Sequence, residues 1–329
     1  MSTAGHARQT AFVAIAVAAG LVAGQLPWVA ANAIHLVVPA LMAMLWTVFV
    51  QVPLRELKAG FRDLRFTGLS LGINFLWTPV FAYLLGWAFL QDRPDLWLGL
   101  IMLLVTPCTD WYLIFTSLAG GNLRVSTAVL PWHLVLQLLL LPVYLLLFAG
   151  AVVPIDYGVV LRSIASVLLV PLALGAVFRR WAEGVRGAAW LADTFVPKAG
   201  SAQLLFLNLA IAAMFASEGA AITSNPLVIL RLLPPLLTFF VLTFVLAIWV
   251  SRRVGFAYAE CASLCFATLA RNSPVALAIA VVAFPERPIV ALALVVGPLV
   301  ELPVLAMTSY TLRAVRPRLF AEPGDPRPD

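Results

Sequence analysis

Residues 96–118 read LWLGLIMLLVTPCTDWYLIFTSL, an apolar run of membrane-spanning length with the polar stretch TPCTD near its centre. A second run, residues 257–284, is interrupted in the same way by RNSP at positions 271–274. Proline lacks the amide donor that a helix interior needs, and polar groups at membrane depth are costly. Each run therefore predicts a helix that is broken in its middle, as in folds whose interrupted helices meet inside the membrane.

The composition is that of a chain embedded in lipid. Of its 329 residues, 63% are hydrophobic and only 11% are charged, whereas about a quarter of a soluble domain is charged. This excludes a cytosolic enzyme, a secreted binding module and a disordered chain. A membrane helix needs ~20 apolar residues, and the sequence offers ten such runs. They are 10–28, 33–53, 67–90, 96–118, 125–149, 158–178, 199–217, 229–250, 257–284 and 289–312.

The two broken runs are the fourth and the ninth, so they occupy corresponding places in two halves of five. Because each half has five spans, the two halves have opposite orientation in the membrane. The prolines of the two breaks, Pro107 and Pro274, each lie 24 residues before a further proline, at Pro131 and Pro298. We therefore predict an all-α polytopic membrane protein with ten transmembrane helices arranged as two inverted five-helix repeats. The expected ranges are a single membrane domain over 1–329, repeat one over about 10–149, repeat two over about 158–312, and a cytoplasmic tail over 313–329.

Most basic residues fall in alternate loops. With the N-terminus inside, the inner side holds 16 of the 21 lysines and arginines. This asymmetry predicts cytoplasmic N- and C-termini in a multi-pass protein of the plasma (inner) membrane. The net charge of +6 then reflects orientation and contact with lipid headgroups, not a nucleic-acid partner. The inner residues are Arg8, Arg55, Lys58, Arg62, Arg65, Arg124, Arg179, Arg180, Arg186, Lys198, Arg252, Arg253, Arg313, Arg316, Arg318 and Arg327.

Four polar side chains lie deep within the apolar runs: Asp110, His133, Arg271 and Glu301. Such groups are functional candidates because their burial is costly. If the broken helices cross, Asp110 and Arg271 are placed to form an intramembrane ion pair. Glu301 stands between two prolines that we expect to loosen its helix, which makes it a candidate proton carrier or a structural carboxyl that bridges free backbone groups.

The cysteines do not form a disulfide framework, because all three lie inside apolar runs. Cys108 follows the proline of the first break, where its soft sulfur is within reach of a permeating solute, although packing is the alternative role. Cys261 and Cys265 share one helix face and are assigned to packing. His133 is interpreted as a packing residue, with a proton relay as the alternative. No metal site and no cofactor are expected.

Three motifs resemble those of a known family. Pro107-Cys108, the stretch LAGGN at 118–122 and GPLVELPVL at 297–305 are similar to the arsenical-resistance-3 arsenite efflux permeases of the bile acid:sodium symporter superfamily. The resemblance implies an inverted repeat with a panel and a core domain, in which the broken fourth and ninth helices cross and build the site. It also places the family's cysteine at Cys108 and the family's glutamate at Glu301.

The second break departs from the arsenite permeases of that family, which usually carry an Asn-Asn-Phe-Glu-like stretch there. Sodium-coupled relatives resemble it more closely, with an Asn-Ser pair that matches Asn272-Ser273. They carry a sodium-binding glutamate and glutamine where this chain has Ala267 and Arg271. A guanidinium at that place would supply the ion's charge and exclude it, so we expect no sodium coupling.

The resulting expectation is secondary active export of arsenite, with antimonite as a second solute, by proton antiport. Cys108, Thr109, Asn272 and Ser273 would bind the solute and Glu301 would carry the proton. The alternative is a transporter of a small organic anion on the same fold, whose carboxylate meets Arg271. An intramembrane enzyme is not expected, because the metalloprotease, nucleophile-elbow and paired-aspartate motifs are missing. The expected partners are a small inorganic or organic solute, protons and membrane lipids; nothing in the sequence indicates a protein partner.

Overall fold

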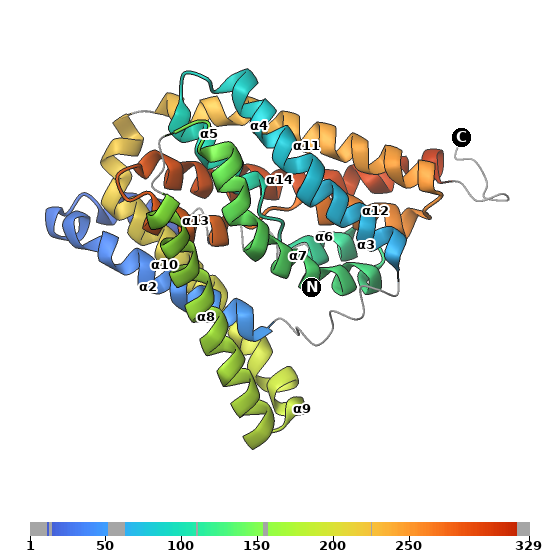
Figure 1. Ribbon diagram of the computed structural model, residues 1–329, viewed down its shortest axis with the longest axis horizontal. Coiled ribbons are helices and arrows are strands. Elements are labelled where there is room, and N and C mark those ends of the chain that lie inside the picture. Colours follow the sequence, from blue (N-terminus) through green and yellow to red (C-terminus); the bar gives the residue numbers. More distant parts are fainter. Residues whose placement is uncertain are drawn as a thin grey trace. The chain divides into compact units, whose positions relative to one another are not determined.

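The computed structural model describes residues 12, 15–51, 63–109, 111–153, 157–224 and 226–320, and all regular elements within them are helices (Figure 1). Residues 15–23 are helical and precede the labelled elements. The elements are α2 (Pro27–Gln51), α3 (Leu64–Gly72), the π-helix η2 (Ile73–Trp77), α4 (Thr78–Phe89), α5 (Pro94–Leu104), α6 (Trp111–Leu118), α7 (Leu123–Tyr144), the π-helix η3 (Leu145–Ala149), α8 (Tyr157–Val185), α9 (Ala188–Trp190), the π-helix η4 (Leu191–Phe195), α10 (Val196–Ser224), α11 (Pro226–Val254), α12 (Tyr258–Leu269), α13 (Ser273–Ala283) and α14 (Pro288–Leu319).

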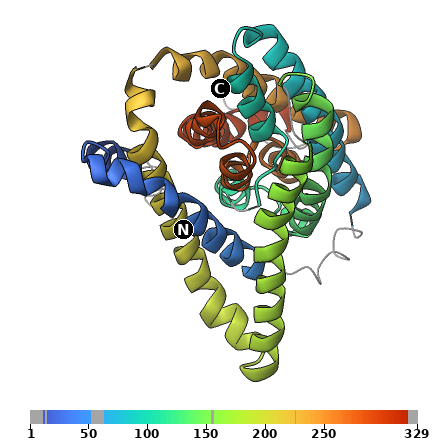
Figure 2. The same ribbon diagram turned by 60° about the vertical axis from the view of Figure 1, so that its left-hand side comes forward.

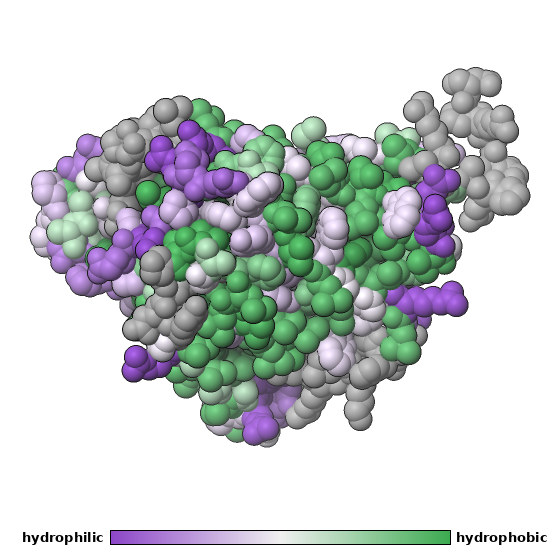
Figure 3. All heavy atoms as spheres, turned by 45° about the horizontal axis from the view of Figure 1, so that its top comes forward, coloured by the Kyte–Doolittle hydropathy of each residue, from purple (hydrophilic) through white to green (hydrophobic). Residues whose placement is uncertain are grey.

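The described helices are those of a multi-pass membrane protein. Seven helical segments are long and apolar enough to cross a membrane, and three shorter helices are also apolar. Hydrophobic side chains cover much of the face in Figure 3. Exposed hydrophobic residues include Leu237, Val241 and Val245 of α11. The long segments are Pro27–Gln51, Leu64–Phe89, Leu123–Phe148, Leu161–Val185, Ala188–Ser217, Leu230–Val254 and Pro288–Pro317. The full set of ten spans in two inverted repeats stays a prediction.

Both expected interruptions are confirmed. Helix α5 ends at Leu104 and α6 begins at Trp111, while α12 ends at Leu269 and α13 begins at Ser273. Some boundaries differ from those expected. The seventh apolar run is preceded by helical turns from Ala188 onward, and α14 continues to Leu319, into the range assigned to the tail. Charged residues near helix ends do not stop a helix that continues into the headgroup region, which the hydropathy pattern alone does not reveal.

The chain divides into two compact units, each assembled from separate stretches of sequence. The first comprises Met1–Pro53, Val153–Leu230 and Pro274–Leu299, and the second comprises Leu54–Val152, Arg231–Ser273 and Val300–Asp329. Each unit therefore draws on both halves of the chain. The assignment of repeats and of a single membrane domain is a separate question and stays a prediction.

In the first unit, α2 packs along α10 and also against α8, as both ribbon views show (Figures 1 and 2). Residues near the start of the chain lie close to α10, because a Cβ on Gly20 would stand 2.4 Å from the carbonyl oxygen of Ala212. Small residues permit this approach, as is common between membrane helices. At the other end, Trp46 and Phe178 pack edge to face, with ring centroids 5.2 Å apart.

In the second unit, α4 packs on α5, and α12 packs on α3, α6 and α7. The α4–α5 contact depends on Gly86, since a Cβ there would lie 1.7 Å from the Trp97 ring. Asn122 caps α7 by accepting from the backbone N–H of Val125 at 3.4 Å. Its own N–H donates to the carbonyl of Ala259 at 3.0 Å. The turn between α6 and α7 is therefore bound to α12, and this fixes the two broken segments side by side.

Candidate functional site

The two interruptions pair with each other inside the second unit. Pro107 and Arg271 form an isolated antiparallel bridge. The Cys108 N–H donates to the carbonyl of Ala270 at 3.0 Å, and the Asn272 N–H donates to the carbonyl of Thr106 at 2.6 Å. Unwound backbone is tolerated at membrane depth only where its polar groups find partners. Each break supplies partners for the other, so the structure places the two broken segments in direct contact.

A threonine lies close to the carboxyl end of each half-helix, Thr106 just after α5 and Thr268 in the last turn of α12. The Thr106 hydroxyl donates to the carbonyls of Met102 and Leu103 at 3.1 and 3.0 Å. The Thr268 hydroxyl does the same for Leu264 at 2.8 Å on α12. The last four carbonyls of a helix have no donor within the helix, so these hydroxyls satisfy only some of those carbonyls. The remaining carbonyls at both ends require another donor.

The guanidinium of Arg271 is that donor. Nη1 donates to the carbonyl of Leu104, the last residue of α5, at 2.7 Å. Nε donates to the carbonyl of Leu269, the last residue of α12, at 3.2 Å. Nη2 donates to the carbonyl of Thr268 and, at 2.8 Å, to Oδ1 of Asn74. One side chain therefore caps the carboxyl ends of both half-helices.

The surroundings of this cation are electrostatically suited to it. Helix C-termini carry a partial negative charge, which favours a cation near the last turn. Arg271 is only 2% exposed, so the interaction is weakly screened. Its guanidinium also lies 5.2 Å from the ring centroid of Phe239 on α11, a cation–π distance. The burial cost of the charge is thus offset by carbonyl dipoles and by an aromatic face.

Glu301 meets the second break from α14. Its Oε1 accepts from the backbone N–H of Arg271 at 3.0 Å, and the residue is 4% exposed. The carboxyl therefore bridges a free backbone group, as one of the two expectations held. Helix α14 runs unbroken through Pro298 and Pro303, and the expected loosening of its hydrogen bonds stays a prediction. A proline's missing N–H removes one helical bond, but the flanking turns keep the helix continuous.

The predicted Asp110–Arg271 ion pair stays a prediction. Asp110 lies outside the described residues. The described partners of the Arg271 guanidinium are backbone carbonyls, Asn74 and the Phe239 ring. These partners already offset much of the cost of burying the Arg271 charge, which the Asp110 carboxylate was expected to offset.

The four predicted solute-binding residues gather at the paired breaks. Cys108, Thr109, Asn272 and Ser273 are all buried. The amide Nδ2 of Asn272 donates to the hydroxyl of Thr109 at 3.5 Å across the two breaks. Cys108 also lies within electrostatic range of the Arg271 guanidinium. The structure thus brings one thiol, two hydroxyls and one amide into a single region.

Sequence reasoning missed Asn74, which holds Arg271 from a third element. It is fully buried in η2, a π-helical turn within the Leu64–Phe89 segment. Its Oδ1 accepts from Arg271 and its Nδ2 donates to the carbonyl of Ala267 at 2.8 Å. π-helical turns are frequent at functional sites. An amide inside the apolar run 67–90 was the available signal, because membrane-embedded polar side chains need partners.

His133 on α7 is fully buried beside Asn74. Its Nε2 lies 3.0 Å from the hydroxyl of Ser70 and 3.3 Å from Nδ2 of Asn74. Its ring stands at 6.1 Å from the rings of Phe75 and Tyr112. The histidine therefore packs against aromatic rings, and it also touches the polar residues behind Arg271. Both roles considered for it remain compatible with these contacts.

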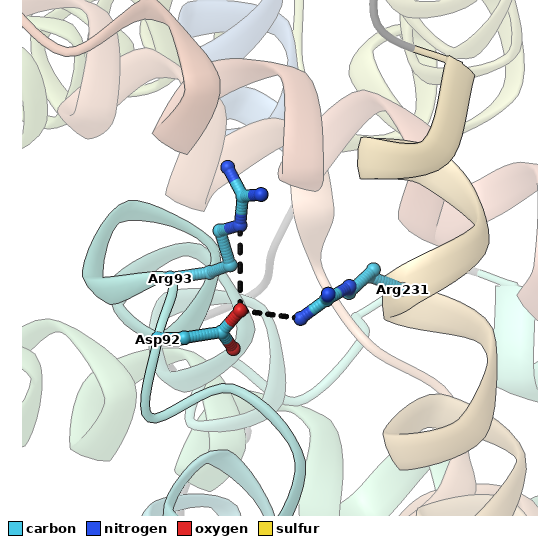
Figure 4. Close-up of polar contacts among 3 residues, drawn as sticks. All are labelled: Asp92, Arg93 and Arg231. Atoms are coloured by element: carbon cyan, nitrogen blue, oxygen red, sulfur yellow. Dashed lines mark hydrogen bonds and ion pairs between the residues drawn. The ribbon is translucent and has the colours of Figure 1, made fainter.

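A separate ion pair links the α4–α5 turn to α11 at the surface of the second unit (Figure 4). Arg231 Nη1 lies 2.5 Å from Oδ2 of Asp92, and Arg93 Nε lies 3.6 Å from the same oxygen. All three side chains are about half exposed. Exposed ion pairs contribute about 0–1 kcal/mol, so this contact positions the turn and adds little stability.

Comparisons with known proteins place the chain among transporters. Residues 38–225, more than half of the chain, match the family described as the Sodium Bile acid symporter family. The chain is similar to "Arsenical-resistance protein Acr3" of Corynebacterium glutamicum, with 28% identity over 87% of this chain and 80% of that protein.

Two further relatives differ in what their names describe. "Arsenical-resistance protein Acr3" of Alkaliphilus metalliredigens is 25% identical over 63% of this chain and 58% of its own length. "Probable sodium/metabolite cotransporter BASS3, chloroplastic" of Arabidopsis thaliana is 24% identical over 68% of this chain and 49% of its own length.

Proposed function

Because the chain belongs to the sodium bile acid symporter family, we propose that it is a secondary active transporter that exports arsenite, with antimonite as a second solute. The coupling is proton antiport, and sodium takes no part. The relatives named arsenical-resistance proteins support the choice of solute. The cytoplasmic placement of both termini and the plasma (inner) membrane belong to the same proposal, on the strength of the basic inner loops.

The position of the Arg271 guanidinium carries the proposal. In transporters with broken helices, half-helix carboxyl ends and unwound carbonyls are the groups that coordinate a coupling cation. Here the carbonyls of Leu104 and Leu269 both accept from Arg271. A tethered guanidinium occupies the centre of such a site and repels a second cation. Sodium coupling through these carbonyls is therefore excluded within the proposal.

The remaining groups suit a neutral, hydroxyl-bearing solute. Arsenious acid is largely neutral near neutral pH, so its site needs hydrogen-bonding groups and one soft ligand but no strong charge. Cys108 supplies the sulfur, while Thr109, Asn272 and Ser273 supply hydrogen bonds. Glu301 carries the proton, because among the described residues it is the carboxyl that contacts the second break. Alternating access follows from movement of one bundle of helices against the other around this region.

A small organic anion is the second candidate, and the resemblance to a sodium/metabolite cotransporter favours it. A carboxylate would need free donors on Arg271, and a guanidinium has five N–H groups. Four of them already have acceptors among the described atoms. Binding of an anion here would have to displace carbonyl contacts that hold the two breaks together, so we favour the neutral solute.

The test is arsenite transport in everted membrane vesicles from a host that lacks its own arsenite pumps. The proposal expects uptake that is driven by an inside-acid proton gradient and is unchanged by a sodium gradient. Cys108→Ser should reduce both uptake and growth on arsenite at least about 10-fold. Thr311→Ala, an exposed change on α14, serves as the control for expression. Full resistance in Cys108→Ser, or several-fold stimulation by sodium, would contradict the proposal.

A further inference from the structure

Two cysteines outside the paired breaks lie against each other on α12. Cys261 and Cys265 are one helical turn apart, a spacing that puts both side chains on one face. Both are free thiols with no exposed surface. The mechanism proposed above uses neither of them.

A buried hydroxyl from a neighbouring helix stands beside this pair. Ser251 lies in the last turns of α11, and its hydroxyl is next to the thiol of Cys261. The residue is fully buried, and its Oγ makes no hydrogen bond of ordinary geometry with any described atom. Buried polar atoms almost always have a partner. Two sulfur atoms and one buried hydroxyl oxygen therefore lie close together in the second unit.

We propose that Cys261, Cys265 and Ser251 form a binding site for a trivalent metalloid, distinct from the region around Cys108. Two adjacent sulfur atoms are the donor set that soft, thiophilic species prefer. A single thiol cannot chelate, whereas two thiols one turn apart hold the same atom and raise its effective affinity. The choice of arsenite as the natural occupant rests on the proposed function.

The reaction at this site is a ligand exchange without redox change. Arsenious acid, As(OH)₃, exchanges two of its hydroxyl groups for the two sulfur atoms. Two As–O bonds break and two As–S bonds form, while the two thiol protons leave with the displaced hydroxyls as two water molecules. Arsenic remains trivalent and keeps one hydroxyl group, which can hydrogen-bond with the Ser251 hydroxyl.

The position of the pair assigns it a role before translocation. Ser251 precedes Arg252 and Arg253, and α12 begins at Tyr258, whose ring lies under the guanidinium of Arg316 at 4.9 Å. These basic residues mark the side that the charge distribution predicts to be cytoplasmic. The site would thus load the solute from the cytoplasm at low concentration, ahead of Cys108.

Arsenic X-ray absorption on the purified full-length protein tests the proposal directly. Protein in detergent is given one equivalent of sodium arsenite, and the sulfur neighbours of arsenic are counted. The proposal expects two sulfur neighbours in the wild type and in Cys108→Ser. It expects at most one in the double variant Cys261→Ser/Cys265→Ser and at least a 10-fold weaker affinity (about 1.4 kcal/mol). An unchanged sulfur count in the double variant, or loss of all As–S bonds in Cys108→Ser alone, would overturn it.

Folding and transport are measured on the same variants. The double alanine variant Cys261→Ala/Cys265→Ala preserves a small apolar packing, and elution as a single species shows that binding is lost without unfolding. In vesicles, both double variants should raise the KM for arsenite several-fold with little change in kcat. Normal KM together with no two-sulfur signal refutes the dithiol site and leaves the proposed function intact. Two-sulfur binding without transport refutes the proposed function and leaves the dithiol site intact.

Discussion

Replacing Arg271 with methionine should cost a large part of the protein's stability. The change keeps an unbranched apolar stem, shorter than that of arginine, and removes all of its donors. Four hydrogen bonds disappear, to Leu104, Thr268, Leu269 and Asn74. At about 1 kcal/mol each they sum to about 4 kcal/mol, and breaking a buried charged contact typically costs about 3–5 kcal/mol. Because a native protein is stable by only about 5–15 kcal/mol, the effect is easily measured.

The assay is thermal unfolding of purified protein in detergent, followed by a thiol-reactive dye or by light scattering. We expect Arg271→Met to lower Tm by about 5–10 °C. Arg271→Lys should lower it by about half as much, because an ammonium keeps the charge and donates to fewer carbonyls. Arg231→Met is the matched control. Its side chain is 47% exposed in a surface ion pair, so its loss should change stability by less than about 1 kcal/mol.

Rescue by a small cation separates a capping role from simple packing. Arg271→Ala leaves space beside the carbonyls of Leu104 and Leu269. If these carbonyls require a cation, guanidinium chloride at concentrations far below those that denature proteins should raise the Tm of this variant, by mass action on the folded state. Choline chloride should not. The reasoning is refuted if Arg271→Met has the same Tm as the wild type, or if Arg271→Lys lowers Tm as much as Arg271→Met.

Three further predictions follow from the same contacts. Glu301→Gln should keep its hydrogen bond to the Arg271 N–H, so Tm should change little. Stimulation of arsenite uptake by a proton gradient in vesicles should disappear. Glu183→Gln on α8 is the control, and retained stimulation in Glu301→Gln would show that Glu301 does not couple transport to protons. Asn74→Ala should destabilise the protein by about 1–3 kcal/mol in thermal unfolding, because Arg271 and Ala267 each lose a partner; unchanged Tm would argue against a role in holding Arg271. Gly86→Ala should lower Tm by an amount equivalent to about 1–3 kcal/mol, since its Cβ would overlap the Trp97 ring, and a stable variant would show that this ring can move.

The broken helices were predictable from sequence because their cause is local. A proline within an apolar run removes a helical hydrogen bond whatever surrounds it. The polar residues beside Pro107 and before Pro274 carry a desolvation cost that the membrane imposes everywhere. The pairing of the two breaks was expected through a family resemblance, and the hydrogen bonds between Thr106 and Asn272 now give it a geometric basis.

The partners of Arg271 were not predictable in the same way. A search for partners by residue type considers side chains, and so it paired Arg271 with the charged residue in the other break. The described acceptors are mainly backbone carbonyls, and a carbonyl is present at every residue without a sequence signature. It becomes available only where a helix ends. Asn74 was missed for a related reason, because nothing in its apolar run indicates that its helix makes a π-helical turn there.

A fixed cation changes what the rest of the site has to supply. An ion that binds and leaves carries the energy of its gradient, whereas a guanidinium attached to the backbone contributes charge in every state and no driving force. The carbonyl ends of α5 and α12 are therefore satisfied without being coupled to transport. Within the proposed function, the driving force must enter through a group that gains and loses a proton, and Glu301 is the described carboxyl that contacts the break. Under this proposal, Arg271 and Glu301 divide between them two tasks that a mobile cation would perform alone: holding the broken helices and linking them to a gradient.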